Sequence, residues 1–124
     1  MYRIGIDLGG TNIVAGVVDE SYRIVATAKC KTAMPRPADA IMADMAEMCR
    51  QAVKNAGLTM DDIAAIGVGS PGVCNAETGV VEFANNLDFH NVPMRDTLQK
   101  LLNKPVQRQK SLKLIMQLKF LMLV

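Results

Sequence analysis

Alternating apolar and polar positions dominate the first third of the chain. Tyr2–Leu8 alternates and is rich in isoleucine, Asn12–Asp19 is rich in valine, and Arg23–Lys31 alternates again. Breaks at Gly9-Gly10 and Glu20-Ser21 separate the three runs. Alternation with a period of two is typical of strands, and short breaks between such runs are typical of hairpins. The pattern predicts three successive antiparallel strands.

Between Pro37 and Gly57 the apolar positions change from alternation to helical spacing. One helical face carries Ile41, Met45, Met48 and Ala52. Proline suits the first turn of a helix because its missing N–H would have no partner there, and glycine suits the residue after a helix. The segment predicts an amphipathic helix of about five turns, whose methionines fill the core rather than forming a binding face.

The second half of the chain mixes strand and helix signals. Ile63–Gly69 is typical of a buried strand, Val80–Phe83 of a short strand, and Pro105-Val106 of the start of a further core strand. Pro93–Leu102 predicts a second helix. Its inward residues are expected to be Met94, Leu98, Leu101 and Leu102. Strands that alternate with helices in this way indicate an α/β domain.

Three short segments predict connections. Gly69–Gly72 cannot continue a regular element and is expected to be a loop, and Asn85-Asn86 is expected to be a turn. Thr59 with Asp62 resembles a capping box at the start of one short turn, which accounts for the acidic pair Asp61-Asp62 better than a metal site does.

Length and charge divide the chain unevenly. Its 124 residues are enough for one domain, and the net charge is +2. Met1–Gln99 contains 8 Lys/Arg and 12 Asp/Glu, whereas Lys100–Val124 contains 6 Lys/Arg and no acid. The last stretch therefore differs in kind from the rest.

Composition also bears on the compartment. Three cysteines without CxxC spacing (Cys30, Cys49 and Cys74) indicate neither a disulfide framework nor a zinc site, and they suit a reducing cytoplasm. The early Asp7 argues against a secretory signal, and Leu112–Val124 is too short and too polar to span a bilayer. We expect a cytoplasmic protein without a membrane partner.

The turn between the first two strands carries the chemistry. Gly9-Gly10 allows torsions closed to other residues and lets main-chain N–H groups approach an anion, while Thr11 and Asn12 add side-chain donors. Asp7 ends a hydrophobic strand, where a carboxylate suits Mg²⁺ or its water. On Gly-Gly alone an ordinary β-turn remains the better explanation. No Gly-Lys-Ser/Thr follows, and a strand rather than a helix comes next, so neither a P-loop nor a Rossmann fingerprint is present.

Three ordered motifs extend the picture. Residues 4–19 (IGIDLGGTNIVAGVVD) resemble the first phosphate loop of the ROK sugar kinases, which have the actin-like ATPase (ribonuclease H-like) fold. Residues 66–73 (IGVGSPGV) resemble that family's sugar-side loop, and residues 86–94 (NLDFHNVPM) resemble its Asn-Leu…Asn-Val-Pro segment. The resemblance covers residues 2 to about 106, and within the family it is nearest to bacterial glucokinases.

The resemblance implies roles for particular residues. Those expected to face the ATP phosphates and Mg²⁺ are Asp7, Gly9, Gly10, Thr11 and Asn12, with Asp7 toward the metal. Those expected to border a hexose, glucose first, are Ser70, Pro71, Gly72 and Asn86. It also implies an α/β actin-like amino-terminal lobe with a mixed sheet, here incomplete, from a homo-oligomeric parent enzyme of carbohydrate metabolism. Family repressors carry a DNA-reading segment ahead of the phosphate loop, so no nucleic-acid partner is expected here.

The chain departs from the family after Val106. There the resemblance implies a strand ending in Glu-Asn-Asp-Ala-Asn, whose Asp is the general base, but residues 107–113 read QRQKSLK. We therefore divide the chain into a lobe of residues 1–106 and an aberrant basic, apolar tail of residues 107–124. Without the base and a second lobe, kinase activity is expected to be negligible, and no residue is assigned a catalytic role.

Two explanations of the tail remain open. A shifted reading frame or a misassembled gene end would produce such a stretch. An evolved short protein whose tail binds a partner or an anionic surface is the alternative. Correspondingly, the alternatives to a kinase fragment are a non-catalytic phosphate- or nucleotide-binding module and a non-functional truncation product. The single histidine, His90, is expected to be a solvated loop residue and Cys74 a buried filler.

Overall fold

The computed structural model describes residues 1–69, 72–75, 77–84 and 87–108. In chain order its elements are β1 (Tyr2–Leu8), β2 (Asn12–Val18), β3 (Ile24–Lys31), α1 (Ala38–Asn55), the 3₁₀ turn η1 (Met60–Asp62), β4 (Ile63–Gly69), β5 (Val73–Cys74), β6 (Val81–Ala84), β7 (Phe89–Val92), α2 (Met94–Leu102) and β8 (Val106–Arg108).

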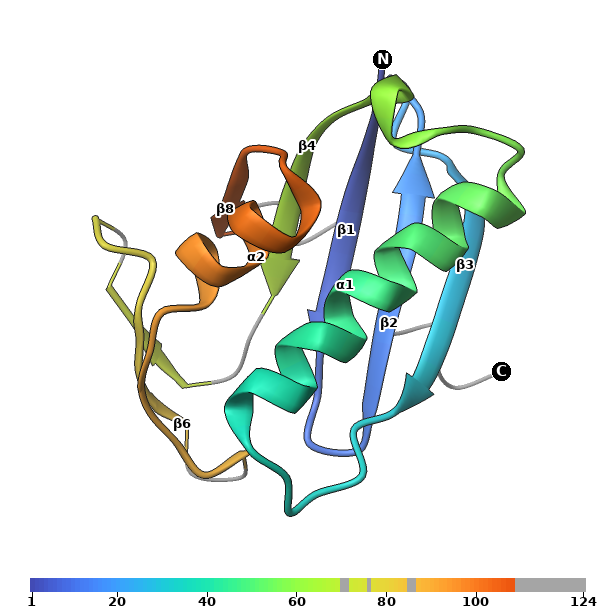
Figure 1. Cartoon of the computed structure of the whole chain (residues 1–124). Coiled ribbons are helices and arrows are strands. Elements are labelled where there is room, and N and C mark those ends of the chain that lie inside the picture. The colour runs from blue at the N-terminus through green and yellow to red at the C-terminus, as the bar shows by residue number, and fades with distance from the viewer. Residues whose placement is uncertain (70–71, 76, 85–86, 109–124) are drawn as a thin grey trace.

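A five-stranded mixed sheet forms the centre of the protein, in the order β3-β2-β1-β4-β8 (Figure 1). The pairs β1–β2 and β2–β3 are antiparallel, which confirms the three predicted hairpin strands. The pairs β1–β4 and β4–β8 are parallel. A parallel partner requires a long crossover, and α1 supplies it between β3 and β4. The expected mixed α/β architecture is therefore present.

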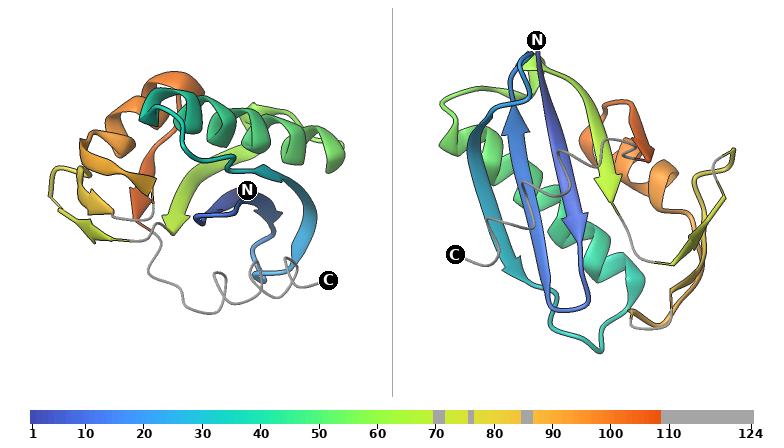
Figure 2. Two further views of the ribbon diagram at one scale, coloured as in Figure 1. Left: turned by 90° about the horizontal axis from the view of Figure 1, so that it is seen from below. Right: turned by 180° about the vertical axis from the view of Figure 1, so that it is seen from behind.

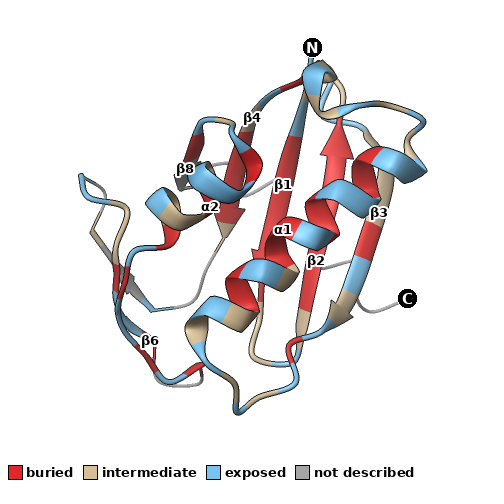
Figure 3. Cartoon of the chain, in the orientation of Figure 1, coloured by how far each residue is buried: buried red, intermediate tan, exposed pale blue. Residues whose placement is uncertain are grey.

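Helices α1 and α2 lie on the same face of this sheet (Figure 2). The buried side of α1 faces the strands and its outer side is exposed (Figure 3). All four residues of the predicted apolar face are buried, at Ile41, Met45, Met48 and Ala52. Met42 is buried as well, so the three predicted core methionines of this helix are confirmed as core residues.

The opposite face of the sheet has a small apolar cluster of its own. Successive strand residues point to opposite faces, so residues between those that pack under α1 point away from it. Val14 and Val18 are buried there, with Ile24 against them. On β1, Ile4, Ile6 and Leu8 belong to the core under the helices.

A second sheet, β5-β6-β7, packs beside the first. The predicted strand at Val80–Phe83 appears as β6, shifted by one residue. Strand β7 was not predicted, and it places His90 in a strand rather than in the expected loop, although its side chain is solvated as expected. The turn at Asn85-Asn86 lies outside the described residues.

Helix α2 differs from expectation at one residue. Met94, Leu98 and Leu102 are buried, whereas Leu101 is 42% exposed, so its inward placement was wrong. Residues at i, i+4 and i+8 form a narrow stripe along a helix, and a helix of 9 residues at the edge of the core buries only that stripe.

The capping box at η1 is confirmed: the Thr59 N–H donates to Oδ2 of Asp62 at 2.9 Å. Within the described part of the chain, no helix has the length and apolar character of a membrane span.

Candidate functional site

The candidate site lies at the carboxyl end of β1. Asp7 is 5% exposed although its side chain is polar. It lies between Ile6 and Leu8, which pack under the helices, so its side chain points to the opposite face of the sheet. Its Cα is in register with Val14 of β2 on one side and with Gly69 of β4 on the other. The carboxylate is therefore held at the centre of the sheet, where β1 gives way to a turn.

That turn is a tight hairpin. The Gly9 N–H donates to the carbonyl oxygen of Asn12 at 2.9 Å, which leaves Gly10 and Thr11 at the tip. A Cβ added at Gly9 would lie 3.2 Å from the same carbonyl oxygen. Thr11 is exposed and Asn12 half-buried. The structure therefore brings the predicted phosphate-side residues Gly9 to Asn12 into one turn, beside the buried carboxylate of Asp7 at the end of β1.

The reason for glycine in this turn differs from the expected one. Among the described residues, the glycines with left-handed φ are Gly57, Gly72 and Gly79, and neither glycine of the turn is among them. At Gly9 the constraint is space, because a side chain would crowd the Asn12 carbonyl oxygen that the Gly9 N–H binds. The expectation of unusual torsions at Gly9-Gly10 was wrong, and close backbone approach is the property that remains.

Thr32 was not anticipated, yet it contacts this turn twice. It follows β3 directly and is fully buried. Its Oγ1 donates to the carbonyl oxygen of Gly9 at 2.7 Å, and its N–H donates to the carbonyl oxygen of Thr11 at 2.8 Å. Only the register of the β2–β3 pair could have indicated this contact: Asn12 pairs with Lys31, which places Thr32 opposite Thr11.

The predicted sugar-side residues follow the neighbouring strand. Because β1 and β4 are adjacent and parallel, their carboxyl ends meet at one edge, with Gly69 beside Asp7. Ser70, Pro71 and Asn86 lie outside the described residues. Gly72 is described, with φ 93°, and a Cβ there would overlap the carbonyl oxygen of Phe83 and lie 2.8 Å from the Cβ of Ala84. Glycine is therefore required at this position on both conformational and steric grounds.

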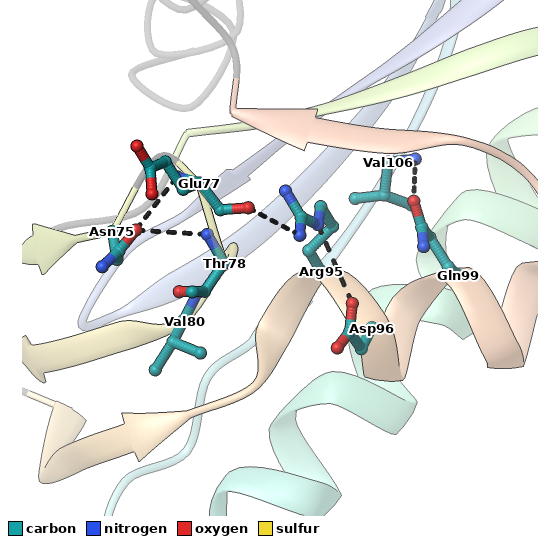
Figure 4. Close-up of polar contacts among 8 residues, drawn as sticks. All are labelled: Asn75, Glu77, Thr78, Val80, Arg95, Asp96, Gln99 and Val106. Atoms are coloured by element: carbon teal, nitrogen blue, oxygen red, sulfur yellow. Dashed lines mark hydrogen bonds and ion pairs between the residues drawn. The ribbon is translucent and has the colours of Figure 1, made fainter.

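A polar network holds the small sheet against α2 (Figure 4). The Oδ1 of Asn75 accepts the N–H groups of Glu77 and Thr78 at 2.9 and 3.1 Å. Arg95, in the first turn of α2, donates its Nη2 to the Glu77 carbonyl oxygen at 3.0 Å and its N–H to the Gly79 carbonyl oxygen at 3.2 Å. Further along the helix, Oε1 of Gln99 accepts the Val106 N–H at 3.2 Å.

His90, Asp88 and Cys49 do not join the site. His90 and Asp88 form an exposed pair with 3.4 Å between Nε2 and Oδ1, and His90 also meets the edge of Phe83. The Cys49 thiol lies in the core under α1, and burial raises its pKa from 9.0 to about 12. A thiol with so high a pKa is a poor nucleophile near neutrality.

The arrangement suits an anion and a cation together. A turn of small residues lets backbone N–H groups approach phosphate oxygens, and Thr11 and Asn12 add donors at its tip. Mg²⁺ in nucleotide sites takes one or two carboxylates from the protein and its other oxygens from phosphate and water. One buried carboxylate beside such a turn fits that set, and Gly69 at the end of β4 lies next to it in the sheet.

Comparison with known proteins agrees with this geometry. The model of the ROK family matches residues 3–115. A glucokinase of Streptomyces coelicolor is 37% identical over 103 residues, which cover 83% of this chain and 30% of that protein. A xylose repressor of Caldicellulosiruptor bescii is 36% identical over 110 residues, covering 83% of this chain and 26% of its own.

Solved structures of ROK family proteins are also similar to this chain. A ROK family glucokinase from Streptomyces griseus, in complex with glucose and AMPPNP, superimposes with a TM-score of 0.73 and 35% identity, over 88% of this chain and 33% of that one. The structural neighbours include ROK sugar kinases, and the expected actin-like fold class is confirmed. The chain spans about a third or less of the length of the curated relatives that it matches.

Proposed function

We propose that this chain, which belongs to the ROK family, is the phosphate-binding part of an ATP-dependent hexose kinase similar to glucokinases. One observation carries the proposal: the buried carboxylate of Asp7 lies between the Gly9–Asn12 turn and the start of the Gly69–Gly72 loop. A nucleotide phosphate at the first loop and a sugar hydroxyl at the second would then approach each other across one sheet edge.

The nucleotide side involves the Gly9–Asn12 turn and Asp7 of β1. Gly9 and Gly10 admit the phosphates of ATP close to the backbone, and Thr11 and Asn12 donate to their oxygens. Asp7 would hold Mg²⁺ through its carboxylate, directly or through water, and the bound ion would offset the phosphate charge. The similar Streptomyces griseus glucokinase was solved in complex with AMPPNP, an analogue of ATP, which supports ATP as the nucleotide.

The sugar side involves the loop after β4. We propose that Ser70, Pro71, Gly72 and Asn86 border the hexose, with glucose as the first candidate because the similar Streptomyces griseus enzyme was solved with glucose. Gly72 has no side chain, and its left-handed φ allows the chain to turn tightly against β6 at this border.

Phosphoryl transfer requires more than this chain contains. Transfer to a hydroxyl needs a base at the acceptor oxygen in addition to positioned phosphates. Beyond Asp96 the chain has no acidic residue, and the segment after Val106 reads QRQKSLK, so no carboxylate follows β8. We propose that the 124-residue chain binds nucleotide without transferring phosphate.

Titration calorimetry with ATP and Mg²⁺ tests the proposal. The unmodified chain is expected to bind ATP–Mg saturably. Gly10→Val places a branched side chain at the tip of the turn and is expected to abolish that binding with the fold intact by circular dichroism. Thr27→Val, in the middle of β3, is the matched control and should bind normally. Binding by Gly10→Val at the unmodified affinity would remove the turn from the nucleotide site.

The same titration separates the alternatives. Binding without activity supports a nucleotide-binding part of a kinase or a non-catalytic binding module, whereas no binding at all supports a non-functional product. Addition of glucose should then tighten ATP–Mg binding only if the second loop borders a sugar next to the phosphates, and an unchanged affinity would argue for the module without a sugar site.

A further inference from the structure

We propose that Thr32 is a positioning residue of the nucleotide site, which aims the main-chain N–H of Gly10, at the tip of the Gly9–Asn12 turn, at the phosphates. The proposal rests on the proposed function, because it assigns Thr32 a role in the same site. Thr32 lies outside the β1–β2 turn. It is the residue directly after β3, the strand that pairs with β2.

The two bonds from Thr32 determine which way the turn faces. Its Oγ1 binds the carbonyl oxygen of Gly9, and its N–H binds the carbonyl oxygen of Thr11. In a planar trans peptide the C=O and the N–H of the next residue point in opposite directions. With the Gly9 carbonyl directed at Thr32, the N–H of Gly10 is directed away from it, at the tip of the turn. The N–H of Asn12 lies on the same side as its C=O and points across the hairpin toward Gly9. One donor of the turn, the Gly10 N–H, thus acquires a defined direction.

Thr32 is itself held from the helix side. The Nε of Arg36 donates to the Thr32 carbonyl oxygen at 3.0 Å, and the Arg36 Nη2 donates to Oδ2 of Asp44 in α1 at 2.6 Å. The Arg36 side chain is 28% exposed, so the pair is partly shielded from water. A continuous series of bonds therefore runs from α1 through Arg36 and Thr32 to the turn.

The backbone after Thr32 is strained, as expected for a residue held in place by its contacts. Ala33 has φ 57°, in the left-handed region that alanine avoids. Such a conformation persists only where the surroundings impose it. Here the contacts on both sides of Ala33 are the Thr32 bonds to the turn and the Arg36 bond back to Thr32. Local preference alone would not produce this segment.

Three variants of the full chain test the proposal. Thr32→Val keeps the shape but removes the hydroxyl, so ATP–Mg affinity is expected to fall roughly tenfold, the effect of losing one buried hydrogen bond. Thr32→Ser keeps the hydroxyl and should restore the affinity. Thr27→Val removes a threonine hydroxyl from the middle of β3, the strand that Thr32 follows, and should bind as the unmodified chain does.

Amide hydrogen exchange gives a readout that does not need nucleotide. In Thr32→Val the Gly9 amide, which binds Asn12 across the turn, should exchange roughly tenfold faster, while amides of α1 keep their protection. Thr32→Ser should exchange as the unmodified chain. Equal Gly9 exchange and equal ATP–Mg affinity in Thr32→Val would overturn the proposal.

The two proposals fail in different ways. If the unmodified chain binds no ATP–Mg, the proposed function fails, and the exchange measurement still decides whether Thr32 orders the turn. If Thr32→Val does not fold, Arg36→Met removes the bond to the Thr32 carbonyl from a partly exposed position. It should raise Gly9 exchange in the same direction, and an unchanged rate there would contradict the proposal.

Discussion

Gly72 adopts a φ of 93°, and the space around its missing side chain is taken by the Phe83 carbonyl and Ala84. Gly72→Ala should therefore combine backbone strain with steric overlap and lower the free energy of unfolding by about 1–3 kcal/mol. Thermal unfolding measures the change. Gly57→Ala is the matched control, because Gly57 has φ 72° with no atom within 4 Å of an added Cβ. Equal losses of unfolding free energy in Gly72→Ala and Gly57→Ala would show that the structure around residue 72 shifts and removes the steric overlap.

Cys49 gives a pH dependence at the residue scale. Burial raises the pKa of its thiol from 9.0 to about 12. The unfolded chain loses this proton near its ordinary pKa while the folded chain keeps it, so stability from Cys49 is complete below pH 9.0 and falls as pH rises toward 12. Over that window the loss is on the order of 4 kcal/mol.

Urea unfolding of the chain and of Cys49→Ala, from neutral pH to about pH 11, isolates this effect. The unmodified chain should lose stability more steeply above pH 9.0 than Cys49→Ala, since only the former carries the buried thiol. Parallel curves would mean that water reaches Cys49 in the folded state and that its pKa is ordinary.

The residue scale is also where sequence reasoning was least complete. The turn residues Asp7 to Asn12 were identified from their own side chains and from the resemblance, whereas Thr32 acts on the turn through backbone carbonyls. No property of a threonine after a strand distinguishes it until the hairpin register is known. Exact pairing of Asn12 with Lys31 depends on an irregularity between Val17 and Val18, which shifts the register and which spacing alone does not reveal.

At the scale of the elements, a side-chain hydrogen bond links helix α2 to strand β8. The Oε1 of Gln99 accepts the N–H of Val106, which is buried. Gln99→Met leaves that N–H without this acceptor and should lower the free energy of unfolding by about 1–3 kcal/mol. Gln99→Glu retains an acceptor oxygen and should cost less. Urea unfolding compares the two, and an equal loss would show that the bond does not hold β8.

The elements that were predicted share strong periodicity. Tyr2–Leu8 has a long alternating pattern, and the helix that begins at Ala38 has a long helical pattern; each pattern matches one buried face. Strand β7 has only four residues, FHNV, and Asn91 has φ 51°, so neither alternation nor strand preference marks it. Pairing with β6, at Phe83 with His90 and Ala84 with Phe89, creates this strand. The pairing with β6 therefore determines this strand, which the local sequence pattern does not predict.

At the scale of the whole molecule, the prediction is binding without turnover. Incubation of the chain with γ-labelled ATP, Mg²⁺ and glucose should yield no labelled sugar phosphate, because no acid follows Asp96 to act as base. Asp7→Asn serves as a control for contaminating kinase. Turnover that Asp7→Asn abolishes would show that the chain is catalytic by itself and that a base was overlooked; turnover common to both preparations would come from another protein.

The position of β1 between β2 and β4 has a consequence for synthesis on the ribosome. Its antiparallel partner follows within a few residues, whereas its parallel partner begins at Ile63, after the whole of α1. The hairpin can close from local contacts while the rest of the chain is still being made, but β1 remains a sheet edge until β4 emerges. Asp7 therefore acquires its Gly69 neighbour late, and the nascent chain passes through a stage in which an apolar strand edge is open to mispairing.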